Sequence, residues 1–454
     1  MIPGGATTLL SESSRREFAP LLAIGVLGLV MVAFVAAGPW IVGTYGYAVL
    51  IPGIVASGAI TVAATALAPS LPARAGLIVI LGLALVMRVL LVGEEPFLST
   101  DIYRYVWDGR VQAAAINPYA YVPADEALKA LRDSAIYPNI NRGDYAVTAY
   151  PPVAQMFFLA VTRIAETLTA MRLAMVACEI VIVAVIIDLL LRLRLPPTAV
   201  VAWAWHPLAI WEISNNGHVD AFMVALMMTG IWLLVCSPAL AGAIAVALAA
   251  LVKPYAVVVL PAFWRRWDWR MPLAVLATMA LCYLPYLGAG RGVLGFATTG
   301  YLSEEGFSDG DGFWLVALVR AAIGQVPGLT AAYVLVALGV MAWLALRSVA
   351  RTETMPHTML ADIAVLLMAG LFFLSPNYAW YFLAVVPFIA LGGGAPAWAM
   401  TLAATLLYRP VTLPVNELAW KTFATLPFVI AVALALMQRG RTATRSHGAS
   451  QWTI

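Results

Sequence analysis

A dense cluster of acids, arginines and aromatic side chains follows one long apolar run of this chain. Asp101 and Asp108 lie seven residues apart with Arg104 between them, so on a helix all three share one face. A carboxylate that no arginine neutralises has the chemistry of a general base toward a hydroxyl group. We assign this role to Asp101, which is nearer the apolar run, and expect Asp108 to pair with Arg104 or Arg110. The alternative is a solvated ladder of acids and bases that caps the preceding helix.

Two further polar groups stand at the ends of apolar runs. His218 and Asp220 flank the start of one run, where Asp220 could orient the imidazole or His218 could bind a phosphate or a sugar hydroxyl. The alternative is that His218 is a packing residue. Lys253, followed by Pro254, interrupts another run and would either bind an anion such as phosphate or form an ion pair with Asp101 or Asp220.

A late turn carries the last candidates. Asn377, Trp380 and Tyr381 resemble a platform for a sugar, although aromatic residues at such a place also anchor helices at the membrane interface. Arg409 would bind phosphate or extend toward the interface. We expect further substrate or phosphate contacts from the first cluster, namely Tyr103, Arg104 and Arg110.

The composition indicates a membrane protein. Of the 454 residues, 63% are hydrophobic and 11% are charged, whereas soluble domains carry about 25% charged residues. The net charge of +3 comes without a basic patch, which argues against nucleic-acid binding. No spacing typical of metal ligands is present, so we expect no cofactor. A weak divalent-cation site in the acidic segment 304–311 is the alternative to a mobile, solvated loop there.

Apolar runs recur along the whole chain and predict an all-α polytopic membrane protein with about 13–14 transmembrane helices. The predicted spans are 19–41, 47–68, 74–93, 170–191, 198–214, 219–236, 239–252, 255–264, 271–289, 329–346, 358–374, 379–393, 396–413 and 421–437. Arginines in the short loops favour cytoplasmic N- and C-termini. This orientation requires 151–165 and 313–323 to lie flat as juxtamembrane helices.

This orientation defines one transmembrane domain, 1–437, followed by a flexible cytoplasmic tail, 438–454. The outer side then holds two long loops, 94–169 and 290–328, and the first contains the Asp101 cluster. Within the spans, Arg88 and Glu179 are expected to form structural pairs. We expect six tryptophans to belong to the aromatic belt at the membrane interface, namely Trp203, Trp205, Trp211, Trp264, Trp267 and Trp269.

Taken together, these motifs resemble the GT-C superfamily of integral-membrane glycosyltransferases, in particular its bacterial mannosyltransferase-like branch. The resemblance covers roughly residues 74–390, although relatives often have one span before the first outer loop rather than three. The motifs that carry it are Asp101-x-Tyr103-x-Tyr105-x-x-Asp108-Gly109-Arg110, Asn117-Pro118-Tyr119, Tyr150-Pro151-Pro152, Gly217-His218-x-Asp220 and Lys253-Pro254.

The resemblance implies a catalytic aspartate in the first outer loop, which maps onto Asp101, and basic residues for the carrier phosphate, for which Lys253 matches best. It also implies a polyprenyl-phosphate sugar as donor and a lipid or glycan as acceptor. A single base on the acceptor side suggests direct displacement with inversion.

Two other classes of function remain open. A transporter or flippase would place its polar groups at mid-membrane, within repeated halves. The polar groups here cluster at the outer face, and no repeat is evident. A membrane assembly factor without catalysis would require the Asp101 cluster to be structural.

Overall fold

A computed structural model describes residues 12–236, 239–264, 267–296, 300–352, 355–408 and 416–449. Across these ranges the protein is 78% helical and contains no strand. The predicted all-α polytopic class is therefore confirmed.

Eight helices in the described ranges are long and apolar enough to cross a membrane. They are α1 (Glu12–Tyr45), α2 (Tyr47–Leu67), α3 (Ala73–Val92), α6 (Leu168–Arg192), α11 (Arg270–Tyr283), α14 (Leu329–Ala350), α15 (Pro356–Leu374) and α18 (Glu417–Ala449). Two of them continue as three-ten helices, α2 as η1 (Ala68–Ser70) and α11 as η7 (Leu284–Leu294). Each of the eight coincides with one of the predicted spans.

The other six predicted spans are shorter or interrupted in the structure. The first of them, 198–214, consists of η4 (Pro197–Val200), α7 (Val201–Ala204), α8 (Pro207–Ala209) and the π-helix η5 (Ile210–Asn215). The remaining five correspond to α9 (Asp220–Cys236), α10 (Ala239–Ala250), η6 (Pro254–Ala262), η9 (Ala379–Val385) with α16 (Val386–Ala390), and α17 (Gly394–Ala404) with η10 (Thr405–Leu407). Proline explains two of the interruptions, because Pro207 and Pro254 each lack the N–H that a preceding helix would need.

The first outer loop is built from short elements. Its helices are α4 (Asp101–Ala113), η2 (Glu126–Leu131), η3 (Tyr137–Asn139) and α5 (Pro152–Thr162). The second outer loop contains α12 (Leu302–Glu304) and α13 (Trp314–Ile323). Helices α5 and α13, predicted to lie flat, are both shorter than the eight long helices.

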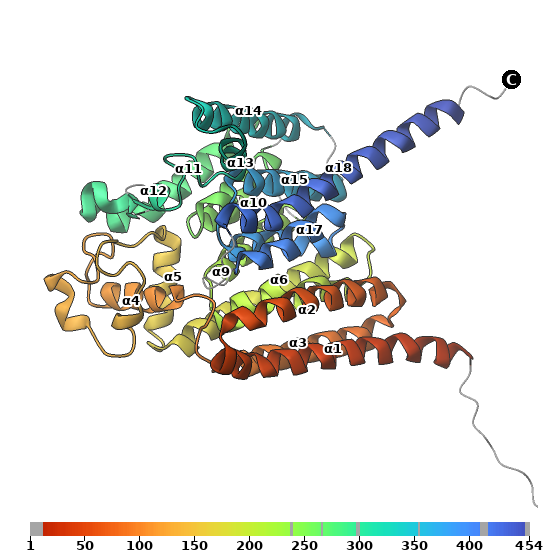
Figure 1. The fold of residues 1–454 in the computed structure, drawn as a ribbon, viewed down its shortest axis with the longest axis horizontal. Coiled ribbons are helices and arrows are strands. Elements are labelled where there is room, and N and C mark those ends of the chain that lie inside the picture. Colours follow the sequence, from red (N-terminus) through yellow and green to blue (C-terminus); the bar gives the residue numbers. More distant parts are fainter. Residues whose placement is uncertain are drawn as a thin grey trace, which may run out of the picture.

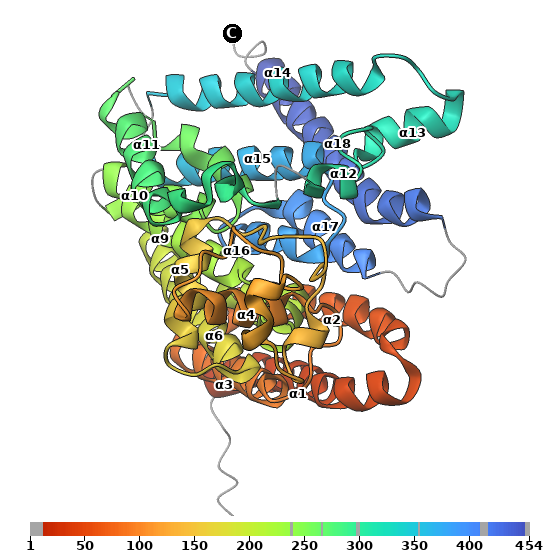
Figure 2. The same ribbon diagram turned by 90° about the vertical axis from the view of Figure 1, so that its left-hand side faces the viewer.

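The long helices form a bundle with the outer loops gathered at one end. In Figure 1, α1, α2, α3 and α6 run in similar directions, and α4 and α5 lie at their left-hand end near α12. Helix α1 packs against α2 and α3, α4 packs on α5, and α14 packs on α15. Figure 2 views the end that carries α4 and α5 face-on. Loops far apart in sequence therefore meet on one face of the bundle.

Polar groups inside the bundle are paired. Arg88 and Glu179 form a buried ion pair of 2.6 Å, and Glu179 also accepts a hydrogen bond from Trp203. The expected structural pairing of Arg88 with Glu179 is thus confirmed. The prediction that Trp203, Trp205 and Trp211 belong to the aromatic belt is wrong. All three are fully buried, because the broken segment 198–214 lies inside the bundle rather than at its surface.

The backbone of α18 remains helical to Ala449. This helix thus extends through part of the segment 438–454, for which the sequence suggested a flexible tail.

Candidate active site

The segment before α4 is held in place by the end of the π-helix η5. The Asn215 side chain accepts a hydrogen bond from the Phe97 amide at 3.3 Å and donates one to the Glu95 carbonyl at 3.0 Å. The Asn216 side chain accepts from the Leu98 amide at 3.2 Å. A π-helix widens the turn and is frequent at functional sites. Here these bonds fix the point at which α4 begins, and therefore the position of Asp101.

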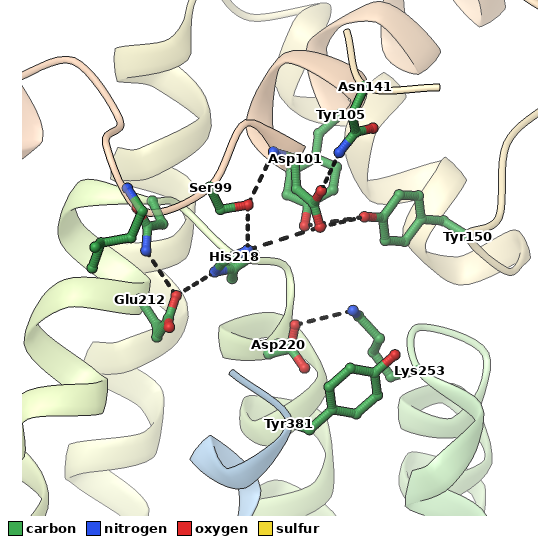
Figure 3. Close-up of polar contacts among 12 residues, drawn as sticks. Ser99, Asp101, Tyr105, Asn141, Tyr150, Glu212, His218, Asp220, Lys253 and Tyr381 are labelled. Atoms are coloured by element: carbon green, nitrogen blue, oxygen red, sulfur yellow. Dashed lines mark hydrogen bonds and ion pairs between the residues drawn. The ribbon is translucent and has the colours of Figure 1, made fainter. Parts of the chain in front are cut away.

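Asp101, the first residue of α4, is held by neutral donors from the outer loop. Its Oδ1 accepts a hydrogen bond of 2.6 Å from Asn141, and its Oδ2 accepts one of 3.0 Å from the Tyr150 hydroxyl. The Asp101 amide donates to the Ser99 hydroxyl at 3.2 Å. Figure 3 shows the carboxylate between Asn141 and Tyr150 with His218 behind it. No arginine pairs with Asp101 in the described part of the chain.

His218 lies behind this carboxylate. Gly217 has a φ of +66°, and this left-handed turn directs the imidazole toward the 98–101 segment. The His218 Nε2 is 3.1 Å from the Ser99 hydroxyl and 3.8 Å from Asp101 Oδ2. Its ring packs on Trp380 with a centroid separation of 4.2 Å. Because His218 is fully buried and does not line the cavity described below, it is placed to position Asp101 rather than to touch a substrate.

Glu212 supports His218 from the other side. Its Oε2 is 2.5 Å from His218 Nδ1 and accepts a hydrogen bond of 2.9 Å from Asn216, while its Oε1 accepts one from Tyr408. The side chain is completely buried. The sequence analysis missed this residue. The signal that could have revealed it is an acid within an apolar run, six residues before a histidine.

The charges around Asp101 favour its ionised form. Burial alone would raise the pKa of Asp101, but the charges of His218 and Lys253, together with the hydrogen bonds, outweigh it and hold the pKa below its usual value. Burial alone would lower the pKa of His218. The facing carboxylates, with Glu212 the nearest, outweigh this and raise it.

Lys253 forms the internal ion pair that the sequence analysis gave as the alternative to phosphate binding. Its Nζ lies 3.3 Å from Asp220 Oδ2, and Asp220 Oδ1 accepts a hydrogen bond of 3.2 Å from Tyr255. The ammonium also lies 5.4 Å from the ring centre of Tyr150 and 5.2 Å from that of Tyr381. The main-chain turn at Lys253, between α10 and η6, occurs where it was predicted.

A cavity of about 780 Å³ opens in front of these groups. Among the predicted site residues, it is lined by Asp101, Arg104, Lys253, Asn377, Trp380 and Tyr381. The structure thus brings together residues from the first outer loop, the Lys-Pro turn and the late turn.

Arg142 and Glu304 join the two outer loops at this cavity, which both of them line. The Arg142 Nε donates to Glu304 Oε1 at 2.6 Å, and its guanidinium is 3.7 Å from Glu305. Glu305 is 5% exposed and accepts a hydrogen bond of 2.8 Å from Asn377. The expectation of a mobile, solvated loop is therefore wrong for Glu304 and Glu305, because ion pairs and hydrogen bonds anchor them. The sequence analysis did not single out Arg142, and its position in a long polar loop gave no signal.

Besides His218, four predicted residues within the described part of the chain do not line this cavity. Asp108 is 1% exposed and pairs with Arg104 at 2.8 Å, one of the two expected partners, while Gln155 donates to its other oxygen at 3.0 Å. Tyr103 donates to Glu95 at 2.9 Å. Arg110 is bound by Asp133 and Glu166 on the far side of α4. Asp220 lies behind Lys253. Arg409 lies outside the described residues.

Two smaller cavities adjoin the large one. The first, of about 410 Å³, shares with it a wall that includes Asn377, Tyr378 and Trp380. The second, of about 360 Å³, is an apolar groove between α14, α15 and η6, and it shares Tyr255 and Leu374 with the large cavity. Within the described residues, no group of three or more histidines, cysteines and acids is arranged to hold a metal ion.

One comparison with known protein families finds a similarity over part of the chain. Residues 84–268 match the family described as alpha-(1->6)-mannopyranosyltransferase, N-terminal domain. This stretch includes Asp101, Glu212, His218 and Lys253. No curated protein and no solved structure matches the chain. The chain is therefore similar, over residues 84–268, which contain the helices and turns that position Asp101, to the N-terminal domain of a GT-C family of mannosyltransferases.

Proposed function

We propose that the protein transfers a mannosyl residue from a polyprenyl-phosphate carrier to a glycan or lipid acceptor, with Asp101 as the general base. The proposed site faces the periplasmic side of a bacterial inner membrane, and both termini are cytoplasmic. The observation that carries the proposal is the position of Asp101: its carboxylate faces a large cavity, lacks an arginine partner among the described residues, and is kept ionised by its neighbours.

The proposed step is a single displacement. The acceptor hydroxyl oxygen attacks the anomeric carbon of mannose while the bond from that carbon to the phosphate oxygen breaks. The hydroxyl proton passes to Asp101, and the carrier phosphate leaves with the bonding electron pair. One displacement inverts the anomeric carbon, so an α-linked product requires a β-linked carrier.

Positive charge at the cavity would stabilise the leaving phosphate. Lys253, Arg104 and Arg142 all line it, and each carries a charge that a developing phosphate dianion attracts. All three cations already have a carboxylate partner, which for Lys253 is Asp220 at 3.3 Å. Lys253 is our first choice for the phosphate contact because its ammonium also lies between the rings of Tyr150 and Tyr381 at the cavity wall. We propose no metal or organic cofactor for this step.

The apolar groove supports a lipid-linked donor. It is lined by aliphatic and aromatic side chains of α14, α15 and η6, and it shares the lining residues Tyr255 and Leu374 with the cavity of Asp101. A long isoprenoid chain gains about 0.8 kcal/mol for each methylene group that leaves water, so such a groove favours it. A head group bound at Lys253 and a tail bound in the groove would place the anomeric carbon inside the large cavity.

The test is transfer of radiolabelled mannose from polyprenyl-phosphate mannose to a lipid and glycan extract, with purified protein in nanodiscs. Asp101→Asn should abolish transfer, since the amide cannot accept the hydroxyl proton. Asp144→Asn is the matched control, because Asp144 is an exposed acid of the same loop that lines none of the three cavities. Transfer by Asp101→Asn at the wild-type rate would reject the base assignment.

A further inference from the structure

Asp108 is a buried acid for which the proposed reaction has no direct use. It lies on α4, seven residues after Asp101, and it is 1% exposed. Both of its carboxylate oxygens accept hydrogen bonds, Oδ1 from Arg104 Nε at 2.8 Å and Oδ2 from Gln155 Nε2 at 3.0 Å. Burying a carboxylate costs free energy unless it is paired, and here the two donors pair it. The contacts that these donors make elsewhere therefore show what the acid orients.

The two donors reach the same irregular stretch of the first outer loop. Arg104 Nη1 donates to the Ala146 carbonyl at 3.1 Å, and Gln155 Nε2 donates to the Thr148 hydroxyl at 2.7 Å. This stretch forms neither helix nor strand, and both contacted residues are buried. Buried polar groups outside regular structure depend on side chains for their hydrogen bonds. Asp108 thus orients two anchors that hold a buried part of the loop.

Tyr150, which donates to the Asp101 carboxylate, is positioned from this stretch. Its amide donates to the Thr148 hydroxyl at 3.3 Å, two residues earlier in the chain. Its ring packs edge-on against Tyr105, with ring centres 5.0 Å apart and an interplanar angle of 88°. The main chain and the ring contact together direct the Tyr150 hydroxyl to Asp101 Oδ2, 3.0 Å away. A displaced Thr148 would therefore move this donor.

Asn141, the other neutral donor to Asp101, is positioned from the same stretch. It lies at the start of a turn that the Ala146 amide closes by donating to the Arg142 carbonyl at 3.0 Å. The Asn141 side chain then donates to Asp101 Oδ1 at 2.6 Å. Figure 3 shows Asn141 and Tyr150 contacting the carboxylate from different sides. Both donors to the base thus depend on the part of the loop that the two anchors hold.

One helix carries both the base and the acid that orients the anchors. Asp101 and Asp108 are about 10 Å apart along α4, at a rise of about 1.5 Å per residue. Helix α5, which carries Gln155, packs closely on α4: a Cβ at Gly109 would lie 2.6 Å from the Phe158 carbonyl oxygen. The distance between the base and the anchors is therefore fixed by two helices in direct contact.

From these contacts we infer that Asp108 is a positioning residue for Asp101. Through Arg104 and Gln155 it holds the part of the loop that supplies both neutral hydrogen-bond donors of the base. It lines none of the three cavities, so it acts without touching a substrate. The inference rests on the proposed function, in which Asp101 is the base. The two acids of α4 then have different tasks: one accepts the proton, and the other keeps the accepting carboxylate oriented.

A titration of Asp101 tests the inference without turnover. The ¹³C NMR signal of the labelled carboxyl, assigned with Asp101→Asn, gives the pKa for the protein in nanodiscs. Gln155→Met removes the amide that joins Asp108 to Thr148, at a similar volume and without a change in charge. It should raise the pKa of Asp101 by about one unit, because the carboxylate loses part of its hydrogen bonding. Gln325→Met, at an exposed glutamine of the second outer loop, should leave this pKa unchanged.

A double variant shows whether Gln155 acts through Tyr150. In a Tyr150→Phe background, Gln155→Met should produce little further shift, because the hydrogen bond that it supports is already absent. The charged groups that face Asp101 are the same in all these variants, namely His218, Lys253 and Arg142. The shifts therefore report hydrogen bonding. An equal shift in both backgrounds, or no shift in Gln155→Met alone, would overturn the inference.

Asp108→Asn tests the acid itself by the separation of kcat from KM. If the wild type transfers mannose, this variant should lower kcat about tenfold or more and leave the donor KM within about twofold, because a misplaced base slows the chemical step. A donor KM raised about tenfold with kcat unchanged would show that Asp108 serves a phosphate contact of Arg104, and would overturn the inference. Gln155→Met leaves every charge in place and should give the same separation, which covers the case in which Asp108→Asn does not fold.

The two kinds of measurement separate this inference from the proposed function. If the Asp101 titration shifts as expected but no carrier supports transfer, the proposed function fails and the positioning network remains. If transfer proceeds and the pKa of Asp101 is the same in Gln155→Met and the wild type, the inference fails alone.

Discussion

His218 and Glu212 are joined through Nδ1 and Oε2 at 2.5 Å, and both side chains are fully buried. The Glu212 carboxylate also accepts hydrogen bonds from Asn216 and Tyr408, which are neutral donors. A buried carboxylate is costly unless an opposite charge lies beside it, so Glu212 favours the imidazolium form of His218. The imidazolium can donate from both nitrogens, toward Glu212 and toward Ser99, beside Asp101.

Glu212→Gln should therefore lower the pKa of His218, because the imidazolium loses its buried counter-charge. The protein has four histidines, so ¹⁵N NMR of labelled imidazoles can follow each one, with His218→Asn used to assign the signal. Tyr408→Phe is the control, since it removes a neutral donor from Glu212 and leaves the carboxylate charge. A His218 titration that is the same in Glu212→Gln and wild type would show that Glu212 does not hold the charge.

Tyr150→Phe should shift the acidic limb of the pH–rate profile upward. The wild-type pKa of Asp101 is depressed, so its ionised, active form persists until the pH falls below the usual range for an aspartate. A hydrogen bond to a charged group contributes about 1.5–3 kcal/mol, and its loss should raise this pKa by about one to two units. The profile of kcat/KM for the donor measures the shift. Tyr121→Phe, at an exposed tyrosine of the same loop, should leave the limb in place.

Lys253→Met should destabilise the protein by about 3–5 kcal/mol, because it leaves the buried Asp220 carboxylate without its cation. The double variant Lys253→Met/Asp220→Asn removes both charges and should recover most of this loss in thermal unfolding. If Lys253 also binds the carrier phosphate, the double variant should still show a donor KM raised about tenfold or more. A double variant with normal stability and normal donor KM would mark Lys253 as structural only.

Ala337→Phe should fill part of the apolar groove, because Ala337 lies on α14 in its wall. The KM for a long-chain polyprenyl-phosphate mannose should rise about tenfold, the cost of excluding two or so methylene groups. A donor with two isoprene units should be used as by the wild type, since its tail is too short to depend on the full groove. Leu335→Phe, at a residue that is 71% exposed and outside the groove, serves as the control. Equal effects on the short and long donors would argue against a tail in this groove.

The sequence by itself determined the all-α membrane class, the positions of eight long helices, and the similarity to GT-C mannosyltransferases. These follow from local properties: a helix that crosses a bilayer needs about 20 consecutive apolar residues, and the motifs around Asp101 and Lys253 are continuous in the chain. The same dependence on local sequence explains the predictions for segment 198–214 that were wrong. A hydropathy pattern does not reveal that Pro207 and the π-helix η5 break 198–214, or that the tryptophans of this segment are buried.

Only the tertiary structure decided which charges meet. Asp101 and Asp108 are alike in sequence, yet Asp108 is neutralised by Arg104 and Asp101 faces a cavity. Arg142 and Glu305 gave no signal, because their partners Glu304 and Asn377 lie 162 and 72 residues away along the chain. Glu212 lies only six residues before His218, but its other partner, Tyr408, is 196 residues away. The electrostatic energy of a side chain depends on distance and burial in three dimensions. The folded arrangement, rather than residue type and spacing, therefore separates the carboxylate that faces the cavity from its structural neighbour.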